Sequence, residues 1–191
     1  MARTRWLVPI TIAAACSTKA SPPPSRTEDR PPGQRADTRA GATSQDSVTP
    51  VVLAPERLPT WTFRSADEGW WSAAGDEQLF VSHVNLGDLA AGKSAAERAE
   101  LVASIYREAN RRQGAAALAV ATDALAAQVG RPVACITAVN VSDHAHAFSC
   151  GLANDSGPVL GIEYTSYRDD ALDAFDARAR ALIARVAAVA N

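Results

Sequence analysis

The stretch that decides the fold runs from Arg131 to Leu152 and reads RPVACITAVNVSDHAHAFSCGL. Both of its arms are rich in β-branched, apolar and small residues, which is typical of strands in a half-buried sheet. A two-residue turn at Ser142 and Asp143 makes the stretch a β-hairpin in which Cys135 lies opposite Cys150. Directly opposed residues bring their Cβ atoms close enough for a disulfide, so we expect a bond that also fixes the register. Two free, buried cysteines are the alternative.

The amino end has the features of an export signal. Two arginines precede a short apolar run that ends at Ala15, whereas a bilayer-spanning helix needs about 20 apolar residues. The last residues of the run, Ala13-Ala14-Ala15-Cys16, resemble the lipobox of bacterial lipoproteins. The resemblance implies that residues 1–15 are a signal peptide, that Cys16 carries a diacylglycerol, and that the protein is anchored in the cell envelope. Ser17 after the cysteine implies the outer membrane, with the chain facing the periplasm.

The use of cysteine agrees with that interpretation. The chain has three cysteines, so one for the lipid and two for the disulfide leave no free thiol. Export also places the chain in an oxidising compartment, where disulfides persist. An ordinary cleavable signal that leaves Cys16 unmodified is the alternative.

Residues 16–58 are predicted to form a disordered tether. They contain seven prolines among serine, threonine, glycine, glutamine and charged residues, and large apolar residues are almost absent before Val48. Such a composition cannot bury enough surface to offset the entropy lost on ordering. We therefore expect the tether to hold a single folded domain, residues 59–191, away from the membrane.

Residues 59–191 are predicted to be an α+β domain with a mainly antiparallel sheet. Alternating and helical apolar patterns predict strands at 60–64, 78–86 and 158–167 beside the hairpin, and helices at 94–114 and from 170 onward. Residues 115–129 are ambiguous: their alanine content favours a helix, which we prefer, but an alternating segment within them allows a strand. Both faces of the hairpin carry apolar or small residues, so helices on each side would give an α/β/α sandwich.

This layout resembles the PsbP-type α/β/α sandwich, which photosynthetic extrinsic proteins share with assorted bacterial lipoproteins. The residues that carry the resemblance are Phe63, Glu68-Gly-Trp70, Val129-Gly-Arg-Pro-Val-Ala134, and Ile162-Glu-Tyr164 ahead of a helix containing Phe175. The resemblance implies a non-enzymatic binding or assembly-assisting role, and no functional residue of that family carries over.

The charge of the domain argues against nucleic acid as a partner. From Arg64 onward there are 11 Lys and Arg residues against 16 Asp and Glu residues, a net charge of −5. No basic stripe is present that would follow a phosphate backbone. We expect the partners to be the membrane, through the lipid, and an envelope protein.

Three histidines and two tryptophans are the candidate site residues. His144 and His146 stand two apart, so on a strand their imidazoles would share one face and bind Zn²⁺ or Cu²⁺, with His83 as a third ligand. A solvated hairpin tip is the alternative. Trp70 and Trp71 would line a ligand groove or pack in the core.

Three common catalytic or phosphate-binding motifs are absent from the sequence. It contains no Gly-x-Ser-x-Gly, no HExxH and no phosphate-binding loop, and we expect no cofactor. Two functions are left: a tethered, non-enzymatic binding or assembly module, which we favour, and a metal-binding or metal-dependent enzyme that uses the three histidines.

Overall fold

A computed structural model describes residues 47–51, 53, 58, 61–65, 70–73, 76–140, 144–168 and 170–190, with the backbone alone for 47, 62–65 and 70–73. The chain divides after Gln45, and every described residue belongs to the second unit, Asp46–Asn191. The expected signal peptide, Cys16 and the first part of the expected tether lie outside the described residues.

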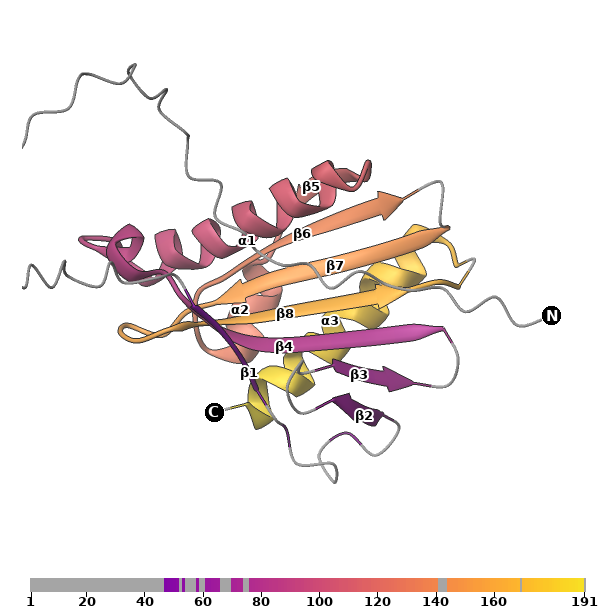
Figure 1. The fold of residues 1–191 in the computed structure, drawn as a ribbon, viewed down its shortest axis with the longest axis horizontal. Helices are drawn as coiled ribbons and strands as arrows, with labels where there is room; N and C mark the ends of the chain where they lie inside the picture. The colour runs from indigo at the N-terminus through magenta and orange to yellow at the C-terminus, as the bar shows by residue number, and fades with distance from the viewer. Residues whose placement is uncertain are drawn as a thin grey trace, which may run out of the picture. The chain divides into compact units, whose positions relative to one another are not determined.

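The described strands form one antiparallel sheet (Figure 1). They are β1 (Ser47–Pro50), β2 (Thr62–Ser65), β3 (Trp70–Ala73), β4 (Glu77–Asn85), β5 (Ala116–Val120), β6 (Val133–Asn140), β7 (Ala145–Leu152) and β8 (Val159–Ser166). Their order is β2-β3-β4-β8-β7-β6-β5, and β1 pairs with β4. β3 and β1 divide one edge of β4 between them, because β3 pairs with its first half and β1 with its second.

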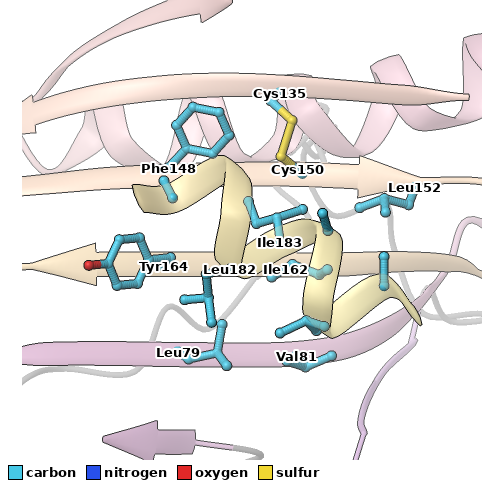
Figure 2. Close-up of a cluster of buried hydrophobic side chains, with 14 of the residues drawn as sticks. Leu79, Val81, Cys135, Phe148, Cys150, Leu152, Ile162, Tyr164, Leu182 and Ile183 are labelled. Atoms are coloured by element: carbon cyan, nitrogen blue, oxygen red, sulfur yellow. A yellow bond between two sulfur atoms is a disulfide. The ribbon is translucent and has the colours of Figure 1, made fainter. Parts of the chain in front are cut away.

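The hairpin at the centre of the prediction is confirmed as β6 and β7, with the predicted register. Val133 lies opposite Leu152, and Cys135 lies opposite Cys150. The two cysteines are disulfide-bonded across a Cα–Cα distance of 4.1 Å. Figure 2 shows the bond within the apolar core, between the strands and α3. The predicted turn at Ser142 and Asp143 lies outside the described residues.

Three α-helices cover the two faces of the sheet. α1 (Ala95–Arg112) lies along β6 and β7 on one face, and α3 (Leu172–Val189) packs on β7 and β8 from the other face, beside α2 (Asp123–Val129). A capping box starts α1, with the Ser94 hydroxyl accepting from the Glu97 N–H. None of the helices in the described part of the chain is both long and apolar enough to cross a bilayer.

Alternate residues of the central strands divide between two cores, as expected of an α/β/α sandwich. Side chains beneath α3 include Leu79, Val81, Phe148, Leu152, Ile162 and Tyr164. Those beneath α1 include Val84, Ala134, Ile136, Ala138 and Val159. The predicted fold class is thereby confirmed.

Residues 115–129 differ from the helix that we preferred. Their first part is the strand β5, paired with β6, and their second part is the short helix α2. Alanine's helix propensity amounts to a fraction of a kcal/mol per residue, so pairing with a neighbouring strand overrides it.

The folded unit also begins earlier than the expected boundary at residue 59. β1 adds a strand to the sheet, and Leu53 and Leu58 are buried in the core beneath α3. The strand β1 and the two leucines therefore belong to the fold. Leu172, the first residue of α3, is 43% exposed, although the apolar spacing of this segment groups it with the core side of the helix.

Candidate functional site

The structure does not bring the three histidines together. His83 in β4 lies opposite Leu160 in β8, which in turn lies opposite Leu152 in β7. His146 stands six residues before Leu152 in the same strand, and six strand residues span about 20 Å. The described part of the chain contains no group of three or more His, Cys, Asp or Glu side chains placed to hold a metal ion.

His144 and His146 have different surroundings. His144 precedes β7 with φ of +50°, a left-handed conformation, so the two-residue strand repeat does not extend to it. The His146 ring packs on Phe175 with centroids 5.2 Å apart, and its Nδ1 is buried without a hydrogen-bond partner among the described residues. His146 therefore acts as an aromatic packing residue against α3.

The two tryptophans predicted to line a ligand groove lie in β3, where the structure describes the backbone alone. Trp70 and Trp71 open β3 and pair with Phe80 and Leu79, but their side chains lie outside the described part of the structure. Trp61 is buried and meets the Tyr164 ring edge-on, with centroids 6.2 Å apart. It packs in the core beneath α3.

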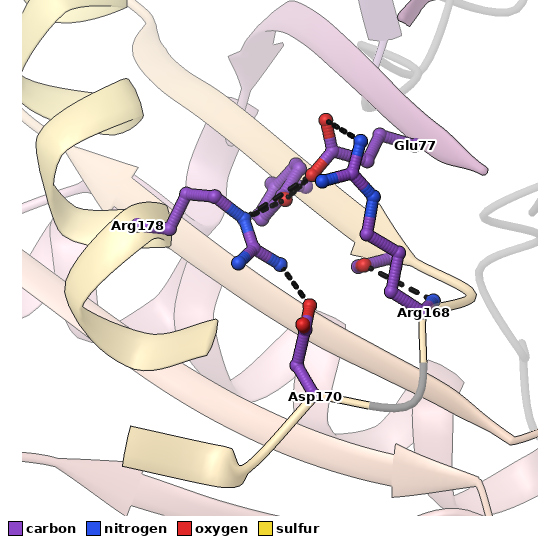
Figure 3. Close-up of polar contacts among 6 residues, drawn as sticks. Glu77, Arg168, Asp170 and Arg178 are labelled. Carbon is purple, nitrogen blue, oxygen red and sulfur yellow. Dashed lines mark hydrogen bonds and ion pairs between the residues drawn. The ribbon is translucent and has the colours of Figure 1, made fainter. Parts of the chain in front are cut away.

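One polar cluster lies at the start of β4, beneath the first turns of α3 (Figure 3). The Tyr164 hydroxyl donates to Glu77 Oε1 at 2.6 Å, and Arg178 Nε lies 3.1 Å from that hydroxyl and 3.2 Å from the same carboxylate oxygen. Arg178 also pairs with Asp170, and Arg168 lies 3.6 Å from Glu77. The cluster joins β4, β8 and α3, whose contact residues are far apart in the sequence.

Two groups of this cluster, Tyr164 and Arg178, have shifted pKa values. Burial and the hydrogen bond to Glu77 raise the pKa of Tyr164 to about 12. The hydrogen bonds that Arg178 makes to Tyr164 and Asp170 raise the pKa of its guanidinium. Because each charged group faces an opposite charge, the cluster clamps α3 to the sheet.

A second polar cluster lies beneath α1, around Glu163 in β8. Glu163 is 5% exposed and lies opposite Phe80 in β4 and Ser149 in β7. The Ser149 hydroxyl donates to its carboxylate at 3.5 Å. Burial raises the pKa of Glu163 to about 7, although the Ser149 hydrogen bond acts in the opposite direction. The interior therefore contains a carboxyl group that changes charge near neutral pH.

Two unpaired hydroxyls complete the cluster beneath α1. The side-chain oxygens of Ser82 and Tyr106 are buried around Gly161, and neither has a hydrogen-bond partner among the other described residues. Burial, and then the charge of Glu163, raises the pKa of Tyr106. Gly161 provides the space for these hydroxyls, since a Cβ there would lie 2.5 Å from Tyr106 Oη and 3.1 Å from Ser82 Oγ.

One exposed feature of the described residues is the edge of the sheet at β5. This strand is last in the sheet order, and among the described residues its only partner is β6. Its sequence, Ala-Ala-Leu-Ala-Val, has no charge and no proline, although natural edge strands commonly carry one or the other. Leu118 at its centre is 65% exposed. β5 therefore offers an apolar edge with free backbone groups.

Local sequence patterns indicate these features only weakly. The alternation Leu118-Ala-Val120 indicated the strand β5. The alanine content of residues 115–129 led us to prefer a helix there, so the edge strand was not predicted. Glu163 was identifiable as a polar residue within an apolar strand, but not as a buried one. The partners of Glu77 are separated from it by up to 101 positions, a distance over which local patterns carry no information.

Comparisons with known proteins gave no match among family models, curated proteins or solved structures. The lipobox and PsbP-type resemblances stay predictions. The Glu163 cluster lies inside the fold and the charged groups of the Glu77 cluster pair with one another, whereas β5 is an edge strand whose one partner among the described residues is β6.

Proposed function

We propose that this protein is a lipid-anchored protein of the bacterial cell envelope whose folded unit acts as a non-enzymatic binding or assembly module. The anchor is a diacylglycerol on Cys16 in the outer membrane. The residues that follow hold the folded unit in the periplasm, where it meets an envelope protein through the β5 edge.

The observation that carries the envelope assignment is the buried disulfide. Cys135 and Cys150 are 4% and 0% exposed and are bonded to each other in the core. Structural disulfides are rare in the cytosol and common in exported proteins. The bond also accounts for two of the three cysteines, which leaves Cys16 for the lipid.

The binding role is supported by the contrast between the interior and the edge. Glu77 and Arg178 are engaged with each other, and Glu163 is covered. By contrast, β5 can receive an extended segment of another protein, with backbone hydrogen bonds giving affinity and exposed side chains such as Leu118 giving selectivity.

The anchor is tested by producing the full chain with its signal in a bacterium that has two membranes. We expect the mature protein to start at Cys16, to carry the mass of a diacylglycerol and to sediment with membranes. Cys16→Ser should lose both the lipid and the membrane association. Alkylation of the unfolded protein should label Cys135 and Cys150 only after reduction. A mature chain with an unmodified Cys16, or two thiols free before reduction, contradicts the proposal.

The binding role is tested in intact cells with a photo-crosslinking amino acid. It replaces Leu118 in one strain and, as a matched control, Leu89 in another; Leu89 is also an exposed leucine and lies in the short 3-10 helix η2 (Gly87–Ala90) before α1. We expect protein adducts from position 118 and none from position 89. Equal adducts from both positions, or none from 118, contradict binding at β5.

A further inference from the structure

We infer that ionisation of the buried Glu163 carboxyl separates α1 from the sheet, so that α1 is the moving layer of a pH-sensitive switch. The separation would uncover the apolar face of the sheet beneath α1. This inference goes beyond the proposed binding role, and it depends neither on the lipid anchor nor on the β5 edge.

The Glu163 carboxyl is surrounded by hydroxyl groups rather than by cations. Ser149 lies opposite it in β7 and donates to it, and Ser82 in β4 lies opposite Gly161, two positions away on the same face. Tyr106 reaches from α1 onto Gly161. Glu163 belongs to none of the ion pairs among the described residues. A neutral carboxyl group suits these surroundings, whereas a carboxylate there lacks the opposite charge that would offset its loss of water.

The charged groups of the neighbouring elements are directed elsewhere. Within the described part of the chain, α1 presents one titratable group to the cluster, the Tyr106 phenol, which stays neutral because burial and the charge of Glu163 raise its pKa. The buried Arg98 of α1 donates to the carbonyl oxygens of Asn154 and Gly157. The other charged residues of α1 are exposed or partly exposed: Glu97, Glu100, Arg107, Glu108, Arg111 and Arg112. The titratable residues of β4 and β7 project from the opposite face of the sheet: Glu77, His83 and His146.

The packing of α1 makes it the layer that can separate. Its buried apolar residues, and those of the sheet beneath it, are mostly small: Ala99, Val102, Ala103, Tyr106, Ala134, Ile136, Ala138 and Gly151. The core beneath α3 contains larger side chains and the disulfide: Leu79, Phe148, Leu152, Ile162, Tyr164, Phe175, Cys135 and Cys150. Apolar stabilisation scales with buried area, so separating α1 should cost less than unfolding the whole domain.

The direction of the switch follows from the proton balance. With α1 in place the pKa of Glu163 is about 7, whereas a carboxyl group reached by water returns toward 4.5. The separated state therefore releases a proton that the closed state holds, and it gains population as the pH rises from about 4.5 to 7. Each pH unit in this window changes the ratio of open to closed states by about tenfold, roughly 300-fold in all, and the ratio is constant above it.

Amide hydrogen exchange of the purified chain with Cys16→Ser measures the opening of α1. An 18-residue helix without its packing partner is marginal in water, so its amides exchange when it separates. Dividing each observed rate by the intrinsic rate at the same pH gives the ratio of open to closed states. We expect this ratio for α1 to rise between pH 5 and 7. At pH 8 it should exceed the global unfolding constant, measured with urea, by at least tenfold.

Two variants connect the opening to Glu163. Glu163→Gln cannot ionise, so the opening of α1 should no longer depend on pH, whereas Glu100→Gln, which removes an exposed carboxylate from α1, should behave as the parent does. Ser149→Ala removes the hydrogen bond that lowers the pKa of Glu163. In this variant the opening should continue to rise to a higher pH before it levels off. Ser104→Ala removes an exposed hydroxyl from α1 and should level off with the parent.

The results that overturn the inference are equally specific. If α1 amides exchange only at the global unfolding constant, α1 does not move separately. If the opening is independent of pH in the parent, or still depends on pH in Glu163→Gln, Glu163 does not drive it. Ser149→Ala keeps the inference falsifiable if Glu163→Gln does not fold, because levelling off at the same pH as the parent would also contradict it.

Discussion

At the scale of single residues, Glu163 makes the stability of the fold depend on pH. It is the buried carboxyl group beneath α1, and its hydrogen bond within the sandwich comes from the Ser149 hydroxyl. Burial raises its pKa from 4.5 to about 7. A carboxyl group with a raised pKa holds a proton in the folded state that the unfolded chain has already released, so folding is less favourable where the group must ionise.

The sign follows from the proton balance. Between about pH 4.5 and pH 7 the folded chain binds more protons than the unfolded chain, so stability falls as the pH rises through this window and then levels off. The full loss from this one group is roughly 3 kcal/mol. Glu163→Gln removes the ionisation and keeps the shape of the side chain. We expect the variant to be more stable than the parent at pH 8 and similar to it near pH 4.5.

Urea unfolding at several pH values between 4.5 and 8 measures this effect as the difference between the parent and the variant. Glu100→Gln, which removes an exposed carboxylate from α1, is the matched control and should track the parent. If the stability of Glu163→Gln declines with pH as steeply as that of the parent, a group other than Glu163 causes the pH dependence.

At the scale of elements, the approach of α1 to the sheet depends on two glycines. A Cβ at Gly151 in β7 would lie 2.6 Å from the backbone oxygen of Ala99, and a Cβ at Gly161 in β8 would lie 2.5 Å from Tyr106 Oη. The first contact is with the helix backbone, whereas the second is with the end of a side chain. A clash at Gly161 can therefore be relieved by shortening a side chain, whereas a clash at Gly151 requires the helix backbone to move.

Alanine at either glycine should destabilise the protein by about 1–3 kcal/mol, as overpacking does. Adding Tyr106→Phe removes the oxygen that Gly161→Ala would contact, so this pair should recover part of the loss. The same Tyr106→Phe change should not rescue Gly151→Ala, because the obstacle there is backbone. Chemical denaturation of the single and double variants measures both couplings. Equal rescue at both glycines contradicts the close contact of α1 with β7.

The elements also show how far the sequence predicts the structure. The hairpin and its register were predictable, because Cys135 and Cys150 are close in sequence and alternation allows one pairing that opposes them. The helix α1 was predictable from a local capping box and stripe. β5 was not, because its conformation depends on pairing with β6 rather than on its own alanine-rich residues. The Glu77 cluster depends on three elements meeting, which no local pattern encodes.

At the scale of the whole molecule, the start of the folded unit determines which residues are left to form the tether. β1 completes one edge of β4, with Val48 opposite Val84 and Thr49 opposite His83. Leu53 and Leu58 are 2% and 0% exposed in the core beneath α3. Composition placed these residues in the tether because prolines surround them, yet Leu53 and Leu58 are both buried in the fold.

Two truncations test this boundary. A chain that begins at Asp46 keeps β1 and both leucines, so we expect it to unfold at the same urea concentration as the full chain. A chain that begins at residue 59 loses them. Burying a leucine contributes about 1.5–3 kcal/mol, so the loss of two should lower the free energy of unfolding by about 3–6 kcal/mol, with the exposed edge of β4 adding a tendency to aggregate. Leu53→Ala with Leu58→Ala in the Asp46 chain separates the contribution of the leucines from that of β1. If the chain from residue 59 is as stable as the chain from Asp46, residues 46–58 belong to the tether, and the membrane-to-domain reach is longer by that segment.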